Sequence, residues 1–460
     1  MNLSRRVCCF LLVFLLSAAG SVAAAPATAE HKLPNGLRVI VKPDHRAPVI
    51  VVMLWYVIGS IDEVNGATGL AHVLEHMAFK GTPTVGNGEY ARIVSEAGGS
   101  FNAFTSNDAT GYYQALQKSH LSLALRLEAD RMSNLLLSED EFKKEIRVVM
   151  EERRLRTDDR PRSLVYEQLM AMALKAHPYR NPIIGWMSDL EHMRIEDVRE
   201  FYRTWYAPNN AILVVVGDVQ PDEVFRLATE HFGPIASKAL PGRRPQSEPP
   251  QRGERRAVVR APAELPHLMM AFPTPLLRDA RKDSEPYALE MLAAVLSGSE
   301  AARLRRSLMR EERVAAEASA GYDGMARGPG FFYLSATPTP GRTIVDVEHG
   351  LRSEMLKIIE EGVTQEELDR AKAQAVAAHV YQRDSMFFQA RQIGVFEISG
   401  IPHDTLDLQL QKLREVTAEQ VREVARKYFK DEALTIVELD PQPMEGRKPA
   451  ASGVRVPHAQ

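Results

Sequence analysis

The residues with the clearest chemical potential lie in the segment Gly69-Leu-Ala-His-Val-Leu-Glu-His-Met77, which contains the pattern His-x-x-Glu-His. On a helix, residues four apart lie on one face, so His72 and His76 can direct imidazole nitrogens at one metal ion. Glu75 adjoins His76 and is better placed to hold a water molecule and take its proton than to bind the ion. The alternative, two surface histidines on an amphipathic helix, is disfavoured because apolar residues flank the motif.

A tetrahedral zinc site with two histidines needs a third protein ligand and leaves one position for water. The acidic segment 139–154, expected to be a helix, offers the glutamates Glu141, Glu145, Glu151 and Glu152. Glu145 and Glu152 are seven residues apart, which puts them on one face and about 10.5 Å apart along a helix axis. One can bind the ion while the other forms a hydrogen bond to a ligand histidine. Composition does not decide which glutamate has which role. Taken alone, the segment is also typical of a solvated charged helix.

The composition is that of an ordinary globular protein. The chain has 460 residues, of which 45% are hydrophobic and 25% charged, and its net charge is -3. This length suits roughly two to three domains, and the charge balance gives no reason to expect nucleic acid as a partner. The two cysteines, Cys8 and Cys9, cannot supply a disulfide framework or a thiolate metal site.

The N-terminal segment 1–24 has the three parts of a secretory signal. Arg5 and Arg6 precede the apolar run 7–16, and small residues lead to an expected cleavage site after Ala24. The apolar run is too short to span a bilayer, and no later stretch is long and apolar enough to do so. A buried N-terminal helix is the alternative. The remaining chain has no cysteine, which suits an exported, periplasmic protein.

A segment rich in proline and charge divides the chain. Residues 241–255 have no apolar periodicity and are expected to form an exposed linker between two domains, 25–240 and 256–441. The tail 442–460 is polar and is expected to be loose. Each of the two large segments is long enough for a core of its own.

The two large segments share a similar order of elements, with strands in clusters rather than in strict alternation with helices. This order predicts an α+β fold of two related domains. Strands are expected at 37–41, 49–57, 100–105, 111–115, 211–216, 268–272, 331–336 and 434–439, and helices at 70–79, 121–137, 139–155, 286–296, 344–361, 365–381 and 418–429.

With its flanking residues, the motif resembles the family of pitrilysin, insulysin and the mitochondrial processing peptidase, which carries the inverted zinc motif. Further similar segments are 101–105, 110–112, 145–152, 177–185 and 206–218. The resemblance implies one zinc ion on His72, His76 and Glu152, with Glu145 behind the ligands and Glu75 as general base. It also implies two α/β-sandwich domains of the same fold, which form half of a clamshell-like peptidase chamber.

The strand expected at 100–105 has a possible role in substrate binding. An extended peptide can add to an exposed strand edge through main-chain hydrogen bonds, largely independent of its sequence. In the family this strand lies beside the metal, which implies that Asn102 and Ala103 align the substrate. A plain core strand is the alternative.

The chain departs from the family pattern in its second half. Active members carry an arginine and, seven residues later, a tyrosine that approach the zinc site, and these positions fall on Met309 and Ala316 here. Arg310 is one residue away, with Glu317 at the shifted partner position. Because a donor for the developing oxyanion contributes strongly to catalysis, the resemblance implies a heterodimer with a zinc-free relative that supplies both side chains. A homodimer or monomer using Arg310 or Arg313 is the alternative.

These features together predict an exported zinc endopeptidase subunit that acts on peptides or unfolded polypeptides. The main alternative is a non-hydrolytic core or scaffold subunit of the same fold, as in some relatives in respiratory complexes. Such relatives usually lose the zinc residues, which are intact here. A periplasmic peptide-binding protein is a third possibility, but it would need neither the two histidines nor Glu75.

Overall fold

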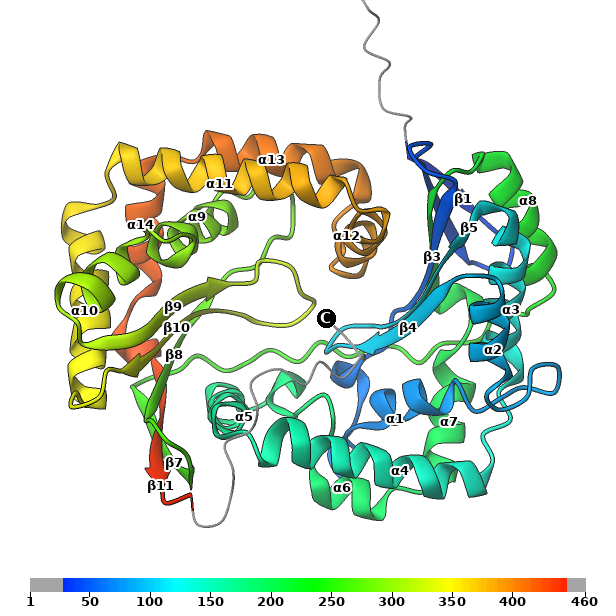
Figure 1. Cartoon of the computed structure of the whole chain (residues 1–460), viewed down its shortest axis with the longest axis horizontal. Helices are drawn as coiled ribbons and strands as arrows, with labels where there is room; N and C mark the ends of the chain where they lie inside the picture. The colour runs from blue at the N-terminus through cyan, green and yellow to red at the C-terminus, as the bar shows by residue number, and fades with distance from the viewer. Residues whose placement is uncertain (1–27, 445–460) are drawn as a thin grey trace, which may run out of the picture.

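Two β-sheets with helices packed on them make up the computed structural model, which describes residues 28–444 (Figure 1). The first sheet has six strands in the order β1-β2-β6-β3-β5-β4. Its strands are β1 (Ala29–Lys32), β2 (Arg38–Pro43), β3 (Val49–Tyr56), β4 (Ser100–Thr105), β5 (Thr110–Gln117) and β6 (Ala211–Gly217).

The second sheet repeats the strand pairing of the first. It has five strands in the order β7-β11-β8-β10-β9. Strand β2 is parallel to β6, and β7 is likewise parallel to β11, whereas all pairs from there to the far edge are antiparallel. The strands are β7 (Arg255–Pro262), β8 (His267–Thr274), β9 (Ala315–Tyr322), β10 (Gly330–Pro338) and β11 (Thr435–Gln442). The predicted α+β fold of two related domains is therefore confirmed.

Most of the helices cover the face of the sheet that belongs to their own half of the chain. In the first half they are α1 (Leu70–Met77), α2 (Glu89–Glu96), α3 (Leu121–Asn134), α4 (Glu139–Arg153), α5 (Pro161–Ala173), α6 (Met187–His192), α7 (Ile195–Trp205) and α8 (Pro221–Phe232). In the second half they are α9 (Glu285–Ser297), α10 (Ile344–Glu361), α11 (Gln365–Arg383), α12 (Met386–Ile398), α13 (Leu406–Glu415) and α14 (Ala418–Tyr428).

The central strand β3 is apolar on both of its faces. Val52 and Leu54 pack into the core formed with helices of the first half, whereas Val51, Met53 and Trp55 face the opposite side of the sheet. All five side chains are buried. Because successive side chains of a strand point to opposite faces, both faces of this sheet need a covering layer.

The second face of each sheet is covered by a helix from the other half of the chain. Helix α12 packs on β3 and β6 of the first sheet, with Ala390 and Ile393 in the shared core. Helix α5 packs on β7, β8 and β11 of the second sheet, with Val165 and Leu169 in the shared core. Figure 1 shows both exchanged helices between the two halves. The halves are therefore joined by two apolar interfaces as well as by the connecting chain.

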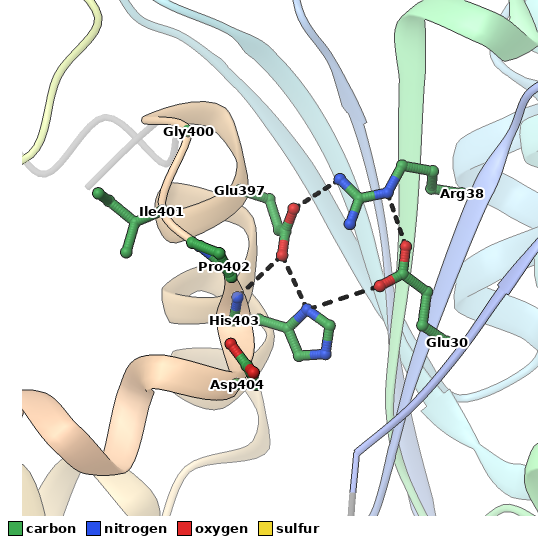
Figure 2. A pocket seen from close by; sticks show the side chains of 8 residues that line it. All are labelled: Glu30, Arg38, Glu397, Gly400, Ile401, Pro402, His403 and Asp404. Atoms are coloured by element: carbon green, nitrogen blue, oxygen red, sulfur yellow. Dashed lines mark hydrogen bonds and ion pairs between the residues drawn. The ribbon is translucent and has the colours of Figure 1, made fainter. Parts of the chain in front are cut away.

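Charged side chains fix the end of α12 to the edge of the first sheet (Figure 2). Arg38 on β2 contacts Glu397 at 2.5 Å and Glu30 on β1 at 2.7 Å. The other carboxylate oxygen of Glu397 lies 2.7 Å from Nδ1 of His403. The Glu397 side chain is only 6% exposed, so these partners satisfy a buried charge. All four residues line a cavity of about 510 Å³ at this junction.

Several predicted elements have the observed bounds or nearly so. Strand β4 and helix α10 begin and end where predicted, and α3 and α4 end three and two residues earlier than predicted. The strand β9 and the exchanged helices α5 and α12 were not predicted. The described stretch 233–254 contains no helix or strand and includes nearly all of the expected linker.

The predicted terminal segments fall mainly on residues outside the described part of the chain. The signal segment 1–24 lies wholly outside it, as does the tail from residue 445, whereas β11 includes Gln442, the first residue of the expected tail. Within residues 28–444, no helix is both long enough and apolar enough to cross a membrane.

Candidate active site

The helix that carries the His-x-x-Glu-His motif is short and buried. Helix α1 follows Gly69, whose φ of 89° is left-handed, and a Cβ there would lie 2.7 Å from the carbonyl oxygen of Ile184. The carboxylate of Glu63 accepts hydrogen bonds from the N–H groups of Gly69 and Ala71, both at 2.8 Å. These amides have no partner within the helix, and a carboxylate is favourable at this end. The preceding loop thus fixes where the motif begins.

His72, His76 and Glu152 offer ligand atoms that all lie within 4.8 Å of one another. Oε2 of Glu152 lies 3.3 Å from Nε2 of His76 and 3.8 Å from Nε2 of His72. Their side chains are 11%, 17% and 14% exposed, in the order His72, His76, Glu152. Two imidazole nitrogens and one carboxylate form a known donor set of catalytic zinc sites, which keep a fourth position open. The chemistry of this cluster therefore fits zinc.

Glu145 contacts the opposite edge of the His76 ring. Its Oε2 lies 3.3 Å from Nδ1 of His76, and its Oε1 lies 2.5 Å from Nζ of Lys80. A carboxylate in this position orients an imidazole and leaves the other ring nitrogen for a metal. The sequence spacing did not separate the two acids, but the geometry places Glu152 among the ligand atoms and Glu145 behind His76.

The carboxylates around His76 favour its protonated form. Burial lowers the pKa of His76, but hydrogen bonds to Glu145 and Glu152 outweigh burial and raise it to about 9. Burial raises the pKa of Glu152, but its hydrogen bond with His76 and the charges of His72 and Arg156 bring it to about 2. A metal ion that binds this cluster must therefore displace a proton from His76.

Glu75 is buried beside the ligand cluster. Oγ1 of Thr105, at the end of β4, donates to Oε2 of Glu75 at 2.5 Å. Burial raises the pKa of Glu75 to about 7, although this hydrogen bond and the charge of His76 oppose the shift. A carboxyl group with a pKa near neutrality can both accept and return a proton at pH 7, as a general base must.

Strand β4 is the edge of the first sheet and lies against the motif helix. It pairs with β5 on one side, where Asn102 faces Tyr113 and Ala103 faces Tyr112, and the sheet ends at β4 on the other side. The N–H of Ala103 donates to Oδ1 of Asn102 at 2.8 Å. The structure thus brings both residues to a strand edge next to α1, where a peptide could add as a further strand.

A cavity of about 540 Å³ opens beside the ligand cluster. Its lining residues all come from the first half of the chain: His72, Glu75, His76, Thr105, Asn107, Glu152, Arg156, Thr157, Arg162, Ser163, Tyr166, Glu167, Met170, Tyr179, Arg180, Asn181, Pro182, Ile183 and Ile184. Among the described residues of the second half, Met309, Arg310, Arg313 and Ala316 are therefore absent from this wall. Arg310 instead contacts Glu300 at 3.0 Å on the surface.

Two side chains at the cluster were missed in the sequence analysis. Nη1 of Arg156 lies 2.6 Å from Oε1 of Glu152, the oxygen that faces away from the histidines. Arg156 follows Glu152 by four residues, so helical spacing could have identified this pair. Thr105 ends a strand that was predicted, but nothing in the sequence indicates that its hydroxyl meets Glu75.

Family profiles and a bacterial relative match both halves of the chain. Residues 38–186 match the family profile described as Insulinase (Peptidase family M16), and residues 192–375 match the profile described as Peptidase M16 inactive domain. The zinc protease PqqE of Helicobacter pylori is 33% identical over 414 residues, which cover 89% of this chain and 92% of that protein. The chain belongs to peptidase family M16, and the resemblance inferred from the motif is confirmed.

Solved structures have the same architecture. The crystal structure of a protease from Helicobacter pylori matches with a TM-score of 0.86 and 32% identity, covering 90% of this chain and 100% of that chain. The periplasmic protease PqqL from Escherichia coli matches with a TM-score of 0.77 and 19% identity, covering 91% of this chain but 48% of that chain. The present chain therefore corresponds to about half of the longer protein, as expected for half of a clamshell.

Proposed function

We propose that the protein is a zinc-dependent endopeptidase subunit that hydrolyses peptides or unfolded polypeptides. The convergence of His72, His76 and Glu152 beside Glu75 in one cavity carries the proposal. Zinc, when bound, supplies Lewis-acid chemistry. Glu75 accepts the proton of the attacking water on its carboxylate and returns it to the leaving amide nitrogen. The hydroxyl of Thr105 donates to that carboxylate and orients it.

Strand β4 provides the alignment that hydrolysis of an extended chain requires. A substrate segment that adds to the outer edge of β4 at Asn102 and Ala103 would run alongside α1, because β4 contacts this helix. Hydrogen bonds to the main chain suit substrates of varied sequence, and an unfolded polypeptide can present its backbone in this way.

We further propose that the active form is a heterodimer with a zinc-free relative that contributes an arginine and a tyrosine. The absence of second-half residues from the described cavity wall supports this assignment. So does Arg310, which lies on the surface and pairs with Glu300. The segment 1–24 leads us to place both chains in an exported compartment, the periplasm of a bacterium.

A non-hydrolytic scaffold subunit is the second candidate, favoured by the match of residues 192–375 to a domain described as inactive. Replacing Glu75 separates the two, because Glu75→Gln keeps the size of the side chain but cannot accept a proton. We expect Glu75→Gln to retain one zinc per chain and to lose cleavage of an internally quenched peptide. Glu151→Gln, on the exposed side of α4, is the control and should retain both.

The assay is run on the chain alone and with the candidate relative added. Cleavage that depends on the relative, and on its own arginine or tyrosine, supports the heterodimer. Full turnover by the isolated chain that Arg310→Ala abolishes would show instead that the chain completes its own site. Turnover by Glu75→Gln equal to that of the unaltered chain would remove Glu75 from the mechanism.

A further inference from the structure

We infer that the cavity beside the ligand cluster contains a subsite for a carboxylate of the bound peptide, formed by Arg180 with Arg162. The inference rests on the proposed function, since it names a feature of the substrate of that same site.

Two of the three acidic groups of the cavity wall have cationic partners, and the third, Glu75, accepts a hydrogen bond from Thr105. Glu152 faces the two histidines through one oxygen and Arg156 through the other. Glu167 accepts hydrogen bonds from both terminal nitrogens of Arg153, at 2.8 and 3.0 Å. Arg153 is buried and is not part of the lining, so it neutralises Glu167 from behind the wall.

Two of the three arginines in the wall are less fully compensated. Arg180 donates to the backbone oxygen of Lys175 at 2.7 Å and makes no ion pair with a carboxylate in residues 28–444. Arg162 lies 2.6 Å from Glu317 of the second half, but the two side chains are 53% and 61% exposed. Exposed ion pairs contribute little stability, so a substrate carboxylate can compete with Glu317. The wall therefore offers a substrate two guanidinium groups that no buried carboxylate neutralises.

The backbone that carries Arg180 is held firmly on both sides. Glu248, from the stretch between the halves, accepts hydrogen bonds from three successive N–H groups at residues 175–177, at 2.6, 2.9 and 3.0 Å. The hydroxyl of Tyr179 donates to Asp108, and Asn181 donates to Asn65 at 3.2 Å. A donor on a fixed loop loses less conformational entropy when it binds.

The shape and chemistry of the wall define the ligand class. A guanidinium presents donors in a planar fork that matches a carboxylate with two hydrogen bonds. In the same cavity wall, Tyr166, Met170 and Ile183 offer apolar surface for the methylene groups of a side chain. The matching group is the carboxylate of an aspartate or glutamate side chain or of the peptide C-terminus.

The test uses the full zinc-loaded chain with any partner that it requires. The probes are internally quenched peptides with blocked ends that carry glutamate or glutamine at one position, moved through the sequence in successive peptides. A second set carries a free or an amidated C-terminus and identifies the source of the carboxylate. The variants are Arg180→Gln, Arg180→Lys and Arg162→Gln, and the matched control is Arg160→Gln, an exposed arginine outside the lining.

We expect the unaltered chain to prefer one carboxylate peptide over its neutral counterpart by about tenfold or more in kcat/KM, in line with hydrogen bonds between charged groups. Arg180→Gln should remove most of this preference, Arg180→Lys should restore part of it, Arg162→Gln should reduce it, and Arg160→Gln should leave it unchanged. No preference in the unaltered chain, or an equal loss in Arg180→Gln and Arg160→Gln, would overturn the subsite.

A failure of the proposed function gives a different result. If no peptide is cleaved under any condition, the peptidase assignment fails, and the subsite is judged from binding alone. Fluorescein-labelled carboxylate and neutral peptides are then titrated with the unaltered chain and with Arg180→Gln. Tighter binding of the carboxylate peptide that Arg180→Gln abolishes supports the subsite, and equal dissociation constants contradict it.

Discussion

Raising the pH from 7 to 9 should strengthen metal binding by this protein, because protons compete with the ion for His76. The imidazole must be neutral to bind a metal, yet Glu145 and Glu152 outweigh burial and hold the pKa of His76 at about 9 in the metal-free chain. Glu152 titrates near pH 2 and is ionised throughout this range. His76 is therefore a ligand whose proton competes with the metal throughout this range.

The size of the effect follows from the pKa. At pH 7 about 1% of His76 is neutral if its pKa is about 9, and at pH 9 about half is neutral, so the apparent affinity for zinc should rise about tenfold from pH 7 to 8 and about 50-fold from pH 7 to 9. Above pH 9 the increase should level off. Below that value, each ion that binds should release close to one proton from His76.

Chelator competition at fixed pH measures the zinc affinity, and calorimetry in buffers of different ionisation enthalpy counts the released protons. Glu145→Gln provides the internal comparison, because it removes one of the carboxylates that raise the pKa of His76 and should flatten the dependence. A zinc affinity that changes less than about threefold between pH 7 and 9, far below the increase of about 50-fold expected from one competing proton, would refute the reasoning.

Further replacements test the separate parts of the structure. Glu152→Ala should lose most of its zinc, whereas Glu145→Ala should lose about 10–100-fold in affinity; zinc titration distinguishes them, and tighter binding by Glu152→Ala would reverse the assignment. Gly394→Ala on α12 would place a Cβ 2.0 Å from the Trp55 ring and should cost about 1–3 kcal/mol of unfolding free energy or more. Gly321→Ala, whose Cβ would meet no atom within 4 Å, is the control in urea denaturation; equal midpoints would contradict the packing.

The sequence was sufficient for the elements that have a strong internal pattern. The apolar runs of β3 and β6 and the capped, periodic helix α10 were predicted within one or two residues at each end. Helix α12 was missed because its sequence is apolar around most of its circumference, which gives no polar face to reveal a helical period. Its exchange with α5 depends on contacts between residues far apart in the chain, and no local pattern records them.

Some residues of the site could likewise be predicted from local spacing, whereas others required the tertiary structure. The spacing of His72, Glu75 and His76 on one helix was enough to predict metal chemistry, because these residues are close in sequence. The separation of Glu145 from Glu152 required the packing of α4 against α1 in the structure. The lack of the family's arginine and tyrosine in the second half was inferred by comparison with the family pattern. In the structure, the described cavity wall contains no second-half residue.

The exchanged helices impose an order on the synthesis of the chain. Helix α5 emerges from the ribosome before the sheet that receives it, whereas the first sheet emerges long before α12. Until residue 398 has been made, the apolar face around Met53 and Trp55 has no cover, and such a surface attracts other chains. The first half should therefore not persist in solution by itself. Conversely, a cut in the connecting stretch should leave a nicked protein whose two pieces stay together.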